Sequence, residues 1–225
     1  MGRSILEIRV LNNYWELGTI VADIVEHTLT LPEPRLILPT GSTPLSLYKE
    51  LVSRQLDWST TTTYNLDEYV GNTIQEQSYR YFMDENLFKH TNIDDDNIYF
   101  PGDIAIWPDM KYGENVDLCL LGIGGNGHIA FNEPGSSFES ETRMVDLTEE
   151  TIKDNSRFFP TIDDVPTQAV TMGLKPIMSS KRIIIMANGK HKKDILEQAM
   201  YGDITENIPA SILQTHTNME AFYCD

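Results

Sequence analysis

The chain has 225 residues, of which 40% are hydrophobic and 23% are charged, and its formal net charge is −17. This length and composition are typical of one α/β domain with a sizeable core. The negative charge argues against nucleic acid or an anionic membrane as the main partner, because both would repel the chain. The negative net charge does not exclude a small anionic substrate, because a few hydrogen-bond donors close to the substrate outweigh the electrostatic field of the whole chain.

Two further features bear on where the protein works. No apolar stretch approaches the ~20 residues needed to cross a bilayer, and the N-terminus lacks the order of basic, apolar and small residues of a signal peptide. Cys119 and Cys224 both lie in apolar, strand-like runs, as expected of buried, reduced thiols. We therefore expect a cytoplasmic protein.

Apolar, strand-like segments alternate with segments of helical period along the chain. The predicted strands are Ile5–Val10, Arg35–Leu38, Thr62–Leu66, Val116–Leu121, Arg143–Asp146, Arg182–Met186 and Glu220–Cys224. The predicted helices are Asn13–Thr28, Thr43–Arg54, Gln77–Phe88, Thr151–Arg157 and Lys190–Met200. Pro101–Asn115 has no clear period and is predicted to be a loop.

This alternation is typical of a parallel sheet with helices on both faces. No internal repeat, low-complexity tract or Gly/Ser linker divides the chain, so we predict one doubly wound, mostly parallel, Rossmann-like α/β domain over residues 1–225. In such folds ligands bind beyond the carboxyl ends of the strands. The turns that follow the strands are therefore the places where function is expected.

The turn over residues 38–44 reads Leu-Pro-Thr-Gly-Ser-Thr-Pro. Gly41 allows a sharp turn, and Thr40, Ser42 and Thr43 place hydroxyls beside the unpaired N–H groups at the start of the next helix. These residues predict an anion or phosphate site, and an ordinary Ser/Thr helix cap is the alternative. The Gly-Lys-Ser/Thr signature of a Walker loop is absent.

The turn over residues 64–71 reads Tyr-Asn-Leu-Asp-Glu-Tyr-Val-Gly. It delivers Asp67 and Glu68 to the end of a strand, among apolar and aromatic side chains. A carboxylate shielded from water has a higher proton affinity and is a useful general base. Asp67 is the candidate for this role, with a solvated acidic turn as the alternative, and Glu68 is expected to hold neighbouring groups instead.

The turn over residues 121–134 reads Leu-Gly-Ile-Gly-Gly-Asn-Gly-His-Ile-Ala-Phe-Asn-Glu-Pro. It combines an imidazole (His128), a carboxylate (Glu133) and two amides (Asn126 and Asn132), which are groups that can move protons on a small molecule. A satisfied core histidine is the alternative for His128, but polar and glycine-rich turns flank it. The other histidines are expected to be structural or surface groups: His27, His90, His191 and His216.

The same turn contains a G-x-G-x-x-G pattern at residues 122–127. A dinucleotide-binding fingerprint must open a long helix, whereas the sequence Asn-Glu-Pro-Gly-Ser-Ser at residues 132–137 interrupts any helix early. The pattern alone is therefore weak evidence for a nicotinamide cofactor.

Two cations, Arg157 and Lys192, lie near the ends of predicted helices in this acidic chain. Taken singly, each is typical of a solvated surface charge. Arginine offers a planar fork and lysine a point charge, and both suit phosphate. Lys192 follows the strand Arg182–Met186, so it reaches the same edge of the sheet as the three turns.

Together these segments resemble the glucosamine-6-phosphate deaminase (isomerase) family. The resemblance runs from Leu36 to Leu213 and includes residues 165–173 and 208–213. Its most specific part is the combination of Leu-Asp-Glu-Tyr-Val-Gly at 66–71 with Gly-His-Ile-Ala-Phe-Asn-Glu-Pro at 127–134. The related 6-phosphogluconolactonases share the fold and the glycine–histidine turn, but are not expected to carry the continuation Phe-Asn-Glu-Pro.

The resemblance implies conversion of glucosamine 6-phosphate to fructose 6-phosphate and ammonia, without a cofactor or a metal. Asp67 would shuttle a proton between C2 and C1 of the open-chain sugar, and His128 would assist ring opening while Glu133 orients and charges its imidazole. Residues 147–166 resemble the family's mobile lid. The residues implied in phosphate binding are Thr40, Gly41, Ser42, Thr43, Arg157 and Lys192.

The chain also departs from the hexameric, allosteric members of the family. Asn126 stands where those members have an aspartate, which makes His128 a weaker base. Arg143 matches one residue of their effector site, but Val145 replaces a lysine, so activation by N-acetylglucosamine 6-phosphate is not expected. The short 101–115 segment and the missing C-terminal extension predict a monomer or a small homo-oligomer.

Three alternatives stay open at this point. Galactosamine-6-phosphate deaminase differs only in the epimer that the sugar pocket accepts. A 6-phosphogluconolactonase would be a hydrolase on the same fold. A sugar-phosphate sensor without catalysis is disfavoured, because phosphate binding alone needs none of Asp67, His128 and Glu133.

Overall fold

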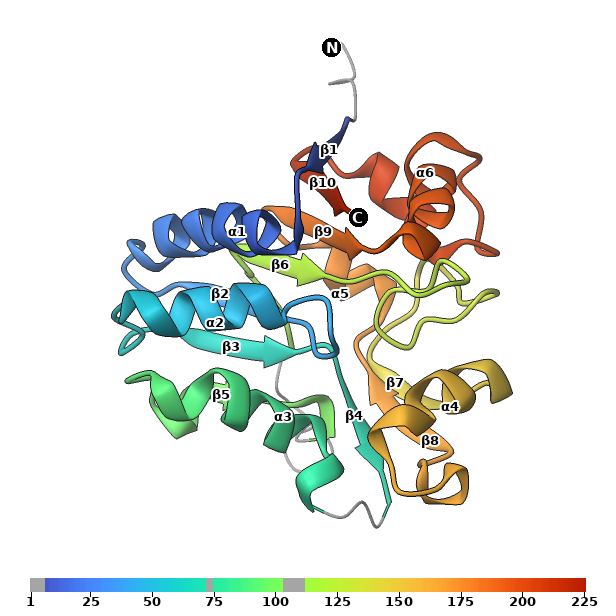
Figure 1. Cartoon of the computed structure of the whole chain (residues 1–225), viewed down its shortest axis with the longest axis horizontal. Helices are drawn as coiled ribbons and strands as arrows, with labels where there is room; N and C mark the ends of the chain where they lie inside the picture. The colour runs from blue at the N-terminus through green and yellow to red at the C-terminus, as the bar shows by residue number, and fades with distance from the viewer. Residues whose placement is uncertain (1–6, 72–74, 103–111) are drawn as a thin grey trace.

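The computed structural model describes residues 7–71, 75–102 and 112–225, in which the chain forms a seven-stranded sheet of order β1-β10-β9-β6-β2-β3-β5 (Figure 1). Each neighbouring pair in it is parallel. The strands are β1 (Ile8–Leu11), β2 (Arg35–Leu38), β3 (Thr62–Asn65), β5 (Ile98–Tyr99), β6 (Leu118–Leu121), β9 (Ile183–Asn188) and β10 (Met219–Cys224). The predicted mostly parallel α/β fold is confirmed.

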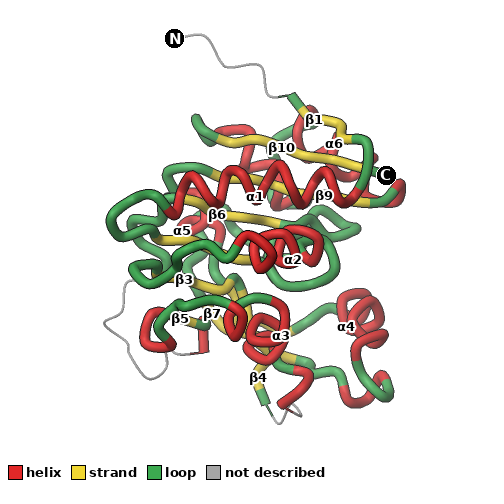
Figure 2. The backbone as a smooth tube through the Cα atoms, turned by 60° about the vertical axis from the view of Figure 1, so that its left-hand side comes forward, coloured by secondary structure: helices red, strands yellow, loops and turns green. Residues whose placement is uncertain are grey.

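Helices cover both faces of this sheet because its strands alternate their side chains between two apolar cores. Leu36 and Leu38 point into one core and Ile37 into the other. The first core contains α1 (Tyr14–Leu29), α2 (Leu45–Arg54) and α3 (Tyr79–Asn86). The second contains α5 (Leu174–Met178) and α6 (Lys193–Tyr201). Figures 1 and 2 both show α1 and α2 side by side over the strands.

A second sheet is antiparallel and, in the described part of the chain, three-stranded, with the order β4-β8-β7. Its strands are β4 (Asp67–Val70), β7 (Arg143–Asp146) and β8 (Gln168–Thr171). Only Leu66 separates β3 from β4, so the chain passes directly from one sheet to the other. The prediction that Arg143–Asp146 belongs to the parallel sheet is wrong, since this strand pairs with β8, and β4 and β8 were not predicted.

The segment 147–166 packs on this small sheet. It contains α4 (Glu149–Asn155), two residues earlier than the predicted helix, and ends in short 3-10 turns. Leu147, Phe159 and Val165 bury their side chains against Tyr69 and Phe131. An aromatic cluster therefore joins this segment to β4 and to the turn that carries His128.

Short 3-10 helices complete the described elements: η1 (Gln75–Gln77), η2 (Phe88–His90), η3 (Asp95–Asn97), η5 (Ser156–Phe158), η6 (Ile162–Asp164), η7 (Lys190–Lys192) and η8 (Pro209–Thr215). Most of the predicted 101–115 loop lies outside the described residues. Cys119 and Cys224 are buried free thiols, as predicted. None of the helices in the described ranges is long and apolar enough to span a membrane.

Candidate active site

A cavity of about 480 Å³ lies where the carboxyl ends of β2, β3, β6 and β9 meet, and β4 and the 147–166 segment border it. Eight of the ten predicted site residues line it: Thr40, Gly41, Ser42, Thr43, Asp67, His128, Arg157 and Lys192. The other two, Asn126 and Glu133, are hydrogen-bonded to each other directly behind His128. The three turns and two cations predicted from sequence therefore converge on one site.

The loop between β2 and α2 forms one wall of the cavity. Gly41 has a φ of 88°, a left-handed conformation that glycine adopts without steric cost and that lets the loop turn sharply after β2. The Thr43 hydroxyl donates to Oδ1 of Asn188 over 3.4 Å, which ties this loop to the end of β9. Ser42 and Thr43 thus lie beside the residues that follow β9.

Besides His128, three side chains that carry or can carry positive charge line the cavity among the described residues. Lys192 ends η7, a turn that precedes α6, rather than lying in the helix as predicted. Arg157 comes from η5 in the 147–166 segment. His191, which the sequence places among structural or surface groups, is exposed and also lines the cavity, because the turn at Gly189, with a φ of 91°, brings η7 back over the strand ends.

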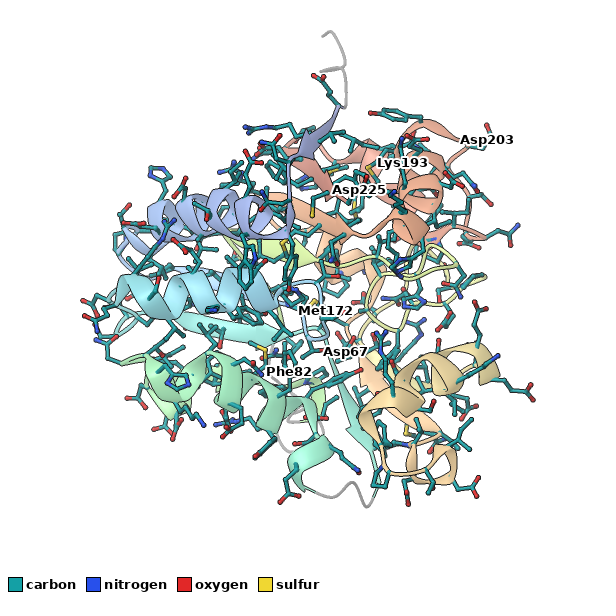
Figure 3. The ribbon with its side chains drawn as sticks, in the orientation of Figure 1. Asp67, Phe82, Met172, Lys193, Asp203 and Asp225 are labelled. Carbon is teal, nitrogen blue, oxygen red and sulfur yellow. The ribbon has the colours of Figure 1, made fainter. Side chains whose placement is uncertain are left out.

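Asp67 is the first residue of β4 and is only 6% exposed. Figure 3 shows it where the chain leaves the large sheet, between the two sheets. Burial, with a smaller contribution from the charge of Glu68, raises the pKa of the Asp67 carboxyl to about 8. Asp67 can therefore accept and return protons near neutral pH.

The Glu68 carboxylate accepts hydrogen bonds from backbone N–H groups, as predicted. Its Oε1 accepts hydrogen bonds from the N–H groups of Tyr69 and Tyr79, both over 2.9 Å. Its Oε2 accepts from the N–H of Arg80 over 2.8 Å. The carboxylate thus accepts hydrogen bonds from N–H groups that have no partner within the first turn of α3, and it links this helix to the strand that carries Asp67.

His128 belongs to a chain of hydrogen bonds in which Asn126 stands closest. Nδ1 of His128 is 2.7 Å from Oδ1 of Asn126 and 3.4 Å from Oε2 of Glu133. The Asn126 amide in turn donates to Oε2 of Glu133 over 2.8 Å. Because both neighbours of Nδ1 are acceptors, Nδ1 carries a hydrogen, and Nε2 is the nitrogen of the neutral ring that accepts a proton.

Glu133 is held ionised in this network. Burial alone would raise its pKa, but the hydrogen bond and positive charge of His128, with hydrogen bonds from Thr151 and Asn126, lower it to about 2. Glu133 therefore stays negative at neutral pH and places its charge 3.4 Å from Nδ1 of His128.

Gly124, in the glycine pattern of this turn, makes room for the imidazole of His128. A Cβ at Gly124 would lie 2.2 Å from Cε1 of His128, so the imidazole rests directly on that backbone. The Gly124 N–H also donates to the carbonyl oxygen of His128 over 2.9 Å. Close packing of an imidazole, and not a dinucleotide, accounts for a glycine at this position.

Sequence reasoning missed several groups around the site. The Thr151 hydroxyl donates to Oε1 of Glu133, although 18 residues separate the two, and no local pattern signals this contact. The Tyr69 hydroxyl accepts from the Tyr79 hydroxyl over 3.1 Å and from the Asn155 amide over 3.0 Å. These contacts bind the 147–166 segment to the turns that carry Glu133 and Asp67.

The fold and the cavity define an α/β protein in which a carboxylate (Asp67) and an imidazole (His128) share a cavity with the 40–43 loop, whose composition suits an anion. The model of the glucosamine-6-phosphate isomerases/6-phosphogluconolactonase family matches residues 18–222. The chain belongs to this family, and the predicted family resemblance is confirmed.

Curated relatives match over nearly the whole chain. A glucosamine-6-phosphate deaminase of Lachnoclostridium phytofermentans is 46% identical, covering 96% of this chain and 99% of the relative. One of Clostridium botulinum is 44% identical, covering 95% of this chain and 94% of the relative.

Solved structures match the whole fold. A monomeric glucosamine-6-phosphate deaminase superposes with a TM-score of 0.89 at 34% identity, covering 97% of each chain. A 6-phosphogluconolactonase of Shewanella baltica superposes with a TM-score of 0.77 at 18% identity, covering 99% of each chain. The second match shows a shared fold alone.

Proposed function

We propose that the protein is a glucosamine-6-phosphate deaminase, which converts glucosamine 6-phosphate to fructose 6-phosphate and ammonia. The observation that carries this proposal is the buried Asp67 carboxyl, which shares one cavity with His128 and the 40–43 loop. The identity to deaminases over the full chain supports the same activity.

In this proposal the sugar phosphate is held by residues 40–43 together with Arg157 and Lys192. The loop offers backbone N–H groups and hydroxyls, and the two cations balance the dianion. Binding the phosphate fixes the orientation of C1 and C2 of the sugar. The phosphate, although remote from the reacting carbons, thereby lowers the activation barrier of the proton transfer.

The chemistry then needs two proton-transfer groups. His128, which lies beside the ionised Glu133, gives a proton to the ring oxygen as the pyranose opens to the aldehyde, and its Nε2 takes up the proton of the C1 hydroxyl in exchange. Ionised Asp67 removes the proton from C2 and delivers it to C1, which turns the amino aldose into a ketose imine. Water adds to C2 of that imine, ammonia leaves, and fructose 6-phosphate results.

The 147–166 segment serves as a lid in this proposal. Its closed position brings Arg157 to the phosphate, and its contacts with Glu133 and Tyr69 order the site as water is excluded. We further propose that the enzyme works in the cytoplasm as a monomer or a small homo-oligomer. Light scattering coupled to size exclusion measures the oligomeric state.

A coupled assay tests the activity. Glucosamine 6-phosphate is expected to yield ammonia and fructose 6-phosphate in equal amounts without added metal or cofactor. Galactosamine 6-phosphate in a parallel reaction reports the epimer preference. Acid release from 6-phosphogluconolactone, with no ammonia from either amino sugar, would replace the proposal with the hydrolase.

Asn126→Asp tests how His128 is tuned. The new carboxylate would face Nδ1 of His128 at hydrogen-bond distance and place a second negative charge beside the imidazole. The pH profile of kcat is expected to move by about one unit to higher pH. An unchanged profile would show that position 126 does not act on His128.

A further inference from the structure

One side chain outside the cavity, Tyr14, connects α1 to the loop over residues 39–44. Its hydroxyl donates to the carbonyl oxygen of Ser42 over 2.6 Å and accepts from the N–H of Ser46 over 3.0 Å. A single hydroxyl thus joins the first residue of α1 to this loop and to the first turn of α2. Tyr14 is absent from the described residues that line the cavity.

The first turn of α2 lacks a cap of its own. Pro44 occupies the N-cap position and makes no side-chain capping bond, although the first N–H groups of any helix have no partner within the helix. The nearest bond inside the loop, from the Leu45 N–H to the Ser42 carbonyl, is long at 3.5 Å. Tyr14 supplies the missing cap from a neighbouring helix.

The position of Tyr14 is set by the start of α1 and by the packing of α1 on α2. Oδ1 of Asn13 accepts hydrogen bonds from the N–H groups of Trp15 and Glu16, both over 3.0 Å, so α1 begins at a fixed point. One turn further on, a Cβ at Gly18 would lie 2.6 Å from the carbonyl carbon of Ser46. The backbones of α1 and α2 are therefore in direct contact one turn from Tyr14.

The bond to Ser42 sets the direction of a peptide unit. In a trans peptide the C=O and the N–H point opposite ways. With the Ser42 carbonyl tied to Tyr14, the N–H of Thr43 points away from α1, and both Ser42 and Thr43 line the cavity. The Tyr14 contact thereby fixes a backbone donor in the wall where the phosphate would lie.

We propose that Tyr14 is a positioning residue for phosphate binding, acting through the Ser42–Thr43 peptide. This inference rests on the proposed function, because it assigns the 40–43 loop to the phosphate of the sugar. Tyr14 differs from the groups that move protons, because in the described part of the chain its hydroxyl forms its hydrogen bonds with backbone atoms of the loop and of α2.

Tyr14→Phe tests the proposal, with Tyr201→Phe as the matched control. The Tyr201 hydroxyl accepts from the N–H of Ile8 over 2.9 Å, at the edge of the large sheet. The KM for glucosamine 6-phosphate and the inhibition constant of inorganic phosphate are both expected to rise about tenfold in Tyr14→Phe, which corresponds to the loss of a backbone hydrogen bond. The kcat of Tyr14→Phe, and all three constants of Tyr201→Phe, are expected to match the wild type.

The outcomes separate this inference from the proposed function. Unchanged KM and phosphate inhibition in Tyr14→Phe would overturn it, as would a lowered kcat at constant KM. If the wild type proves inactive on amino-sugar phosphates, the proposed function fails. Calorimetry with inorganic phosphate then decides the role of Tyr14: about tenfold weaker binding to Tyr14→Phe supports it, and equal or no binding to both proteins overturns it.

Discussion

Asp67→Asn is expected to lower kcat about 1000-fold or more while inorganic phosphate still binds with its wild-type affinity. An amide has nearly the same shape but cannot accept and return the C2 proton, and general-base catalysis typically accounts for about 10²–10⁴ in rate. Steady-state kinetics with glucosamine 6-phosphate, combined with phosphate calorimetry, measures both quantities. Asp146→Asn, an exposed carboxylate at the end of β7, is the control and should keep full activity.

The difference in stability between Asp67→Asn and the wild type is expected to depend on pH. Below pH about 4 the Asp67 carboxyl is protonated in both the folded and the unfolded chain. As the pH rises towards 8, the unfolded chain releases this proton while the folded chain, with its pKa of about 8, retains it, so the wild type loses stability. Asp67→Asn should therefore melt several degrees higher than the wild type at pH 8 and at the same temperature near pH 4.

Two results would contradict this account of Asp67. Substantial turnover by Asp67→Asn would show that another group moves the C2 proton. A loss of phosphate affinity with kcat intact would place Asp67 in binding and not in chemistry.

His128→Gln is expected to lower kcat about 100- to 1000-fold, because glutamine cannot transfer a proton to the ring oxygen. Ring opening should then limit the rate. With a substrate deuterated at C2, a kinetic isotope effect on kcat reports how far C2–H cleavage limits turnover. The isotope effect of the wild type is expected to shrink towards unity in His128→Gln. Rapid-mixing kinetics with both isotopic substrates measures the change.

His216→Gln provides the control for this variant. Nε2 of His216 lies 2.8 Å from the carbonyl oxygen of Ser180, in a structural contact. Its loss should lower stability without changing the isotope effect. A wild-type kcat in His128→Gln would remove His128 from the mechanism, and an undiminished isotope effect would assign it to a step other than ring opening.

The large sheet and its strand-end turns were predictable because they depend on local signals. The apolar runs that became β6 and β9, and the helical period of α1, are visible over fewer than twenty residues, and parallel order brings the carboxyl ends of the strands together. The sequence therefore predicts that Asp67, His128 and the 40–43 loop share one site.

The small sheet was not predictable on the same grounds. The segment Asp67–Val70 begins with two carboxylates, and its partner Gln168–Thr171 lies about a hundred residues away. Only tertiary pairing makes either a strand, because tertiary context overrides weak β propensity. The hydrogen bond of Thr151 to Glu133 is invisible for the same reason.

The order of the groups behind His128 depends on how the backbone turns, which the sequence does not show. The family resemblance implies that Glu133 orients the imidazole, but the turn at Gly127, with a φ of 87°, folds Asn126 into the nearer position. His191 lacks the glycine-rich and polar setting that His128 has in the sequence, and the turn at Gly189 that carries it to the cavity has no helical or strand signature.

A crystal structure of Asp67→Asn with glucosamine 6-phosphate bound tests the central claim most directly. We predict the phosphate on residues 40–43 and Lys192, with C1 and C2 within hydrogen-bond reach of the side chain at position 67 and the ring oxygen beside His128. A phosphate bound elsewhere, or a sugar whose C2 faces away from position 67, would contradict the convergence of the strand ends on one reaction.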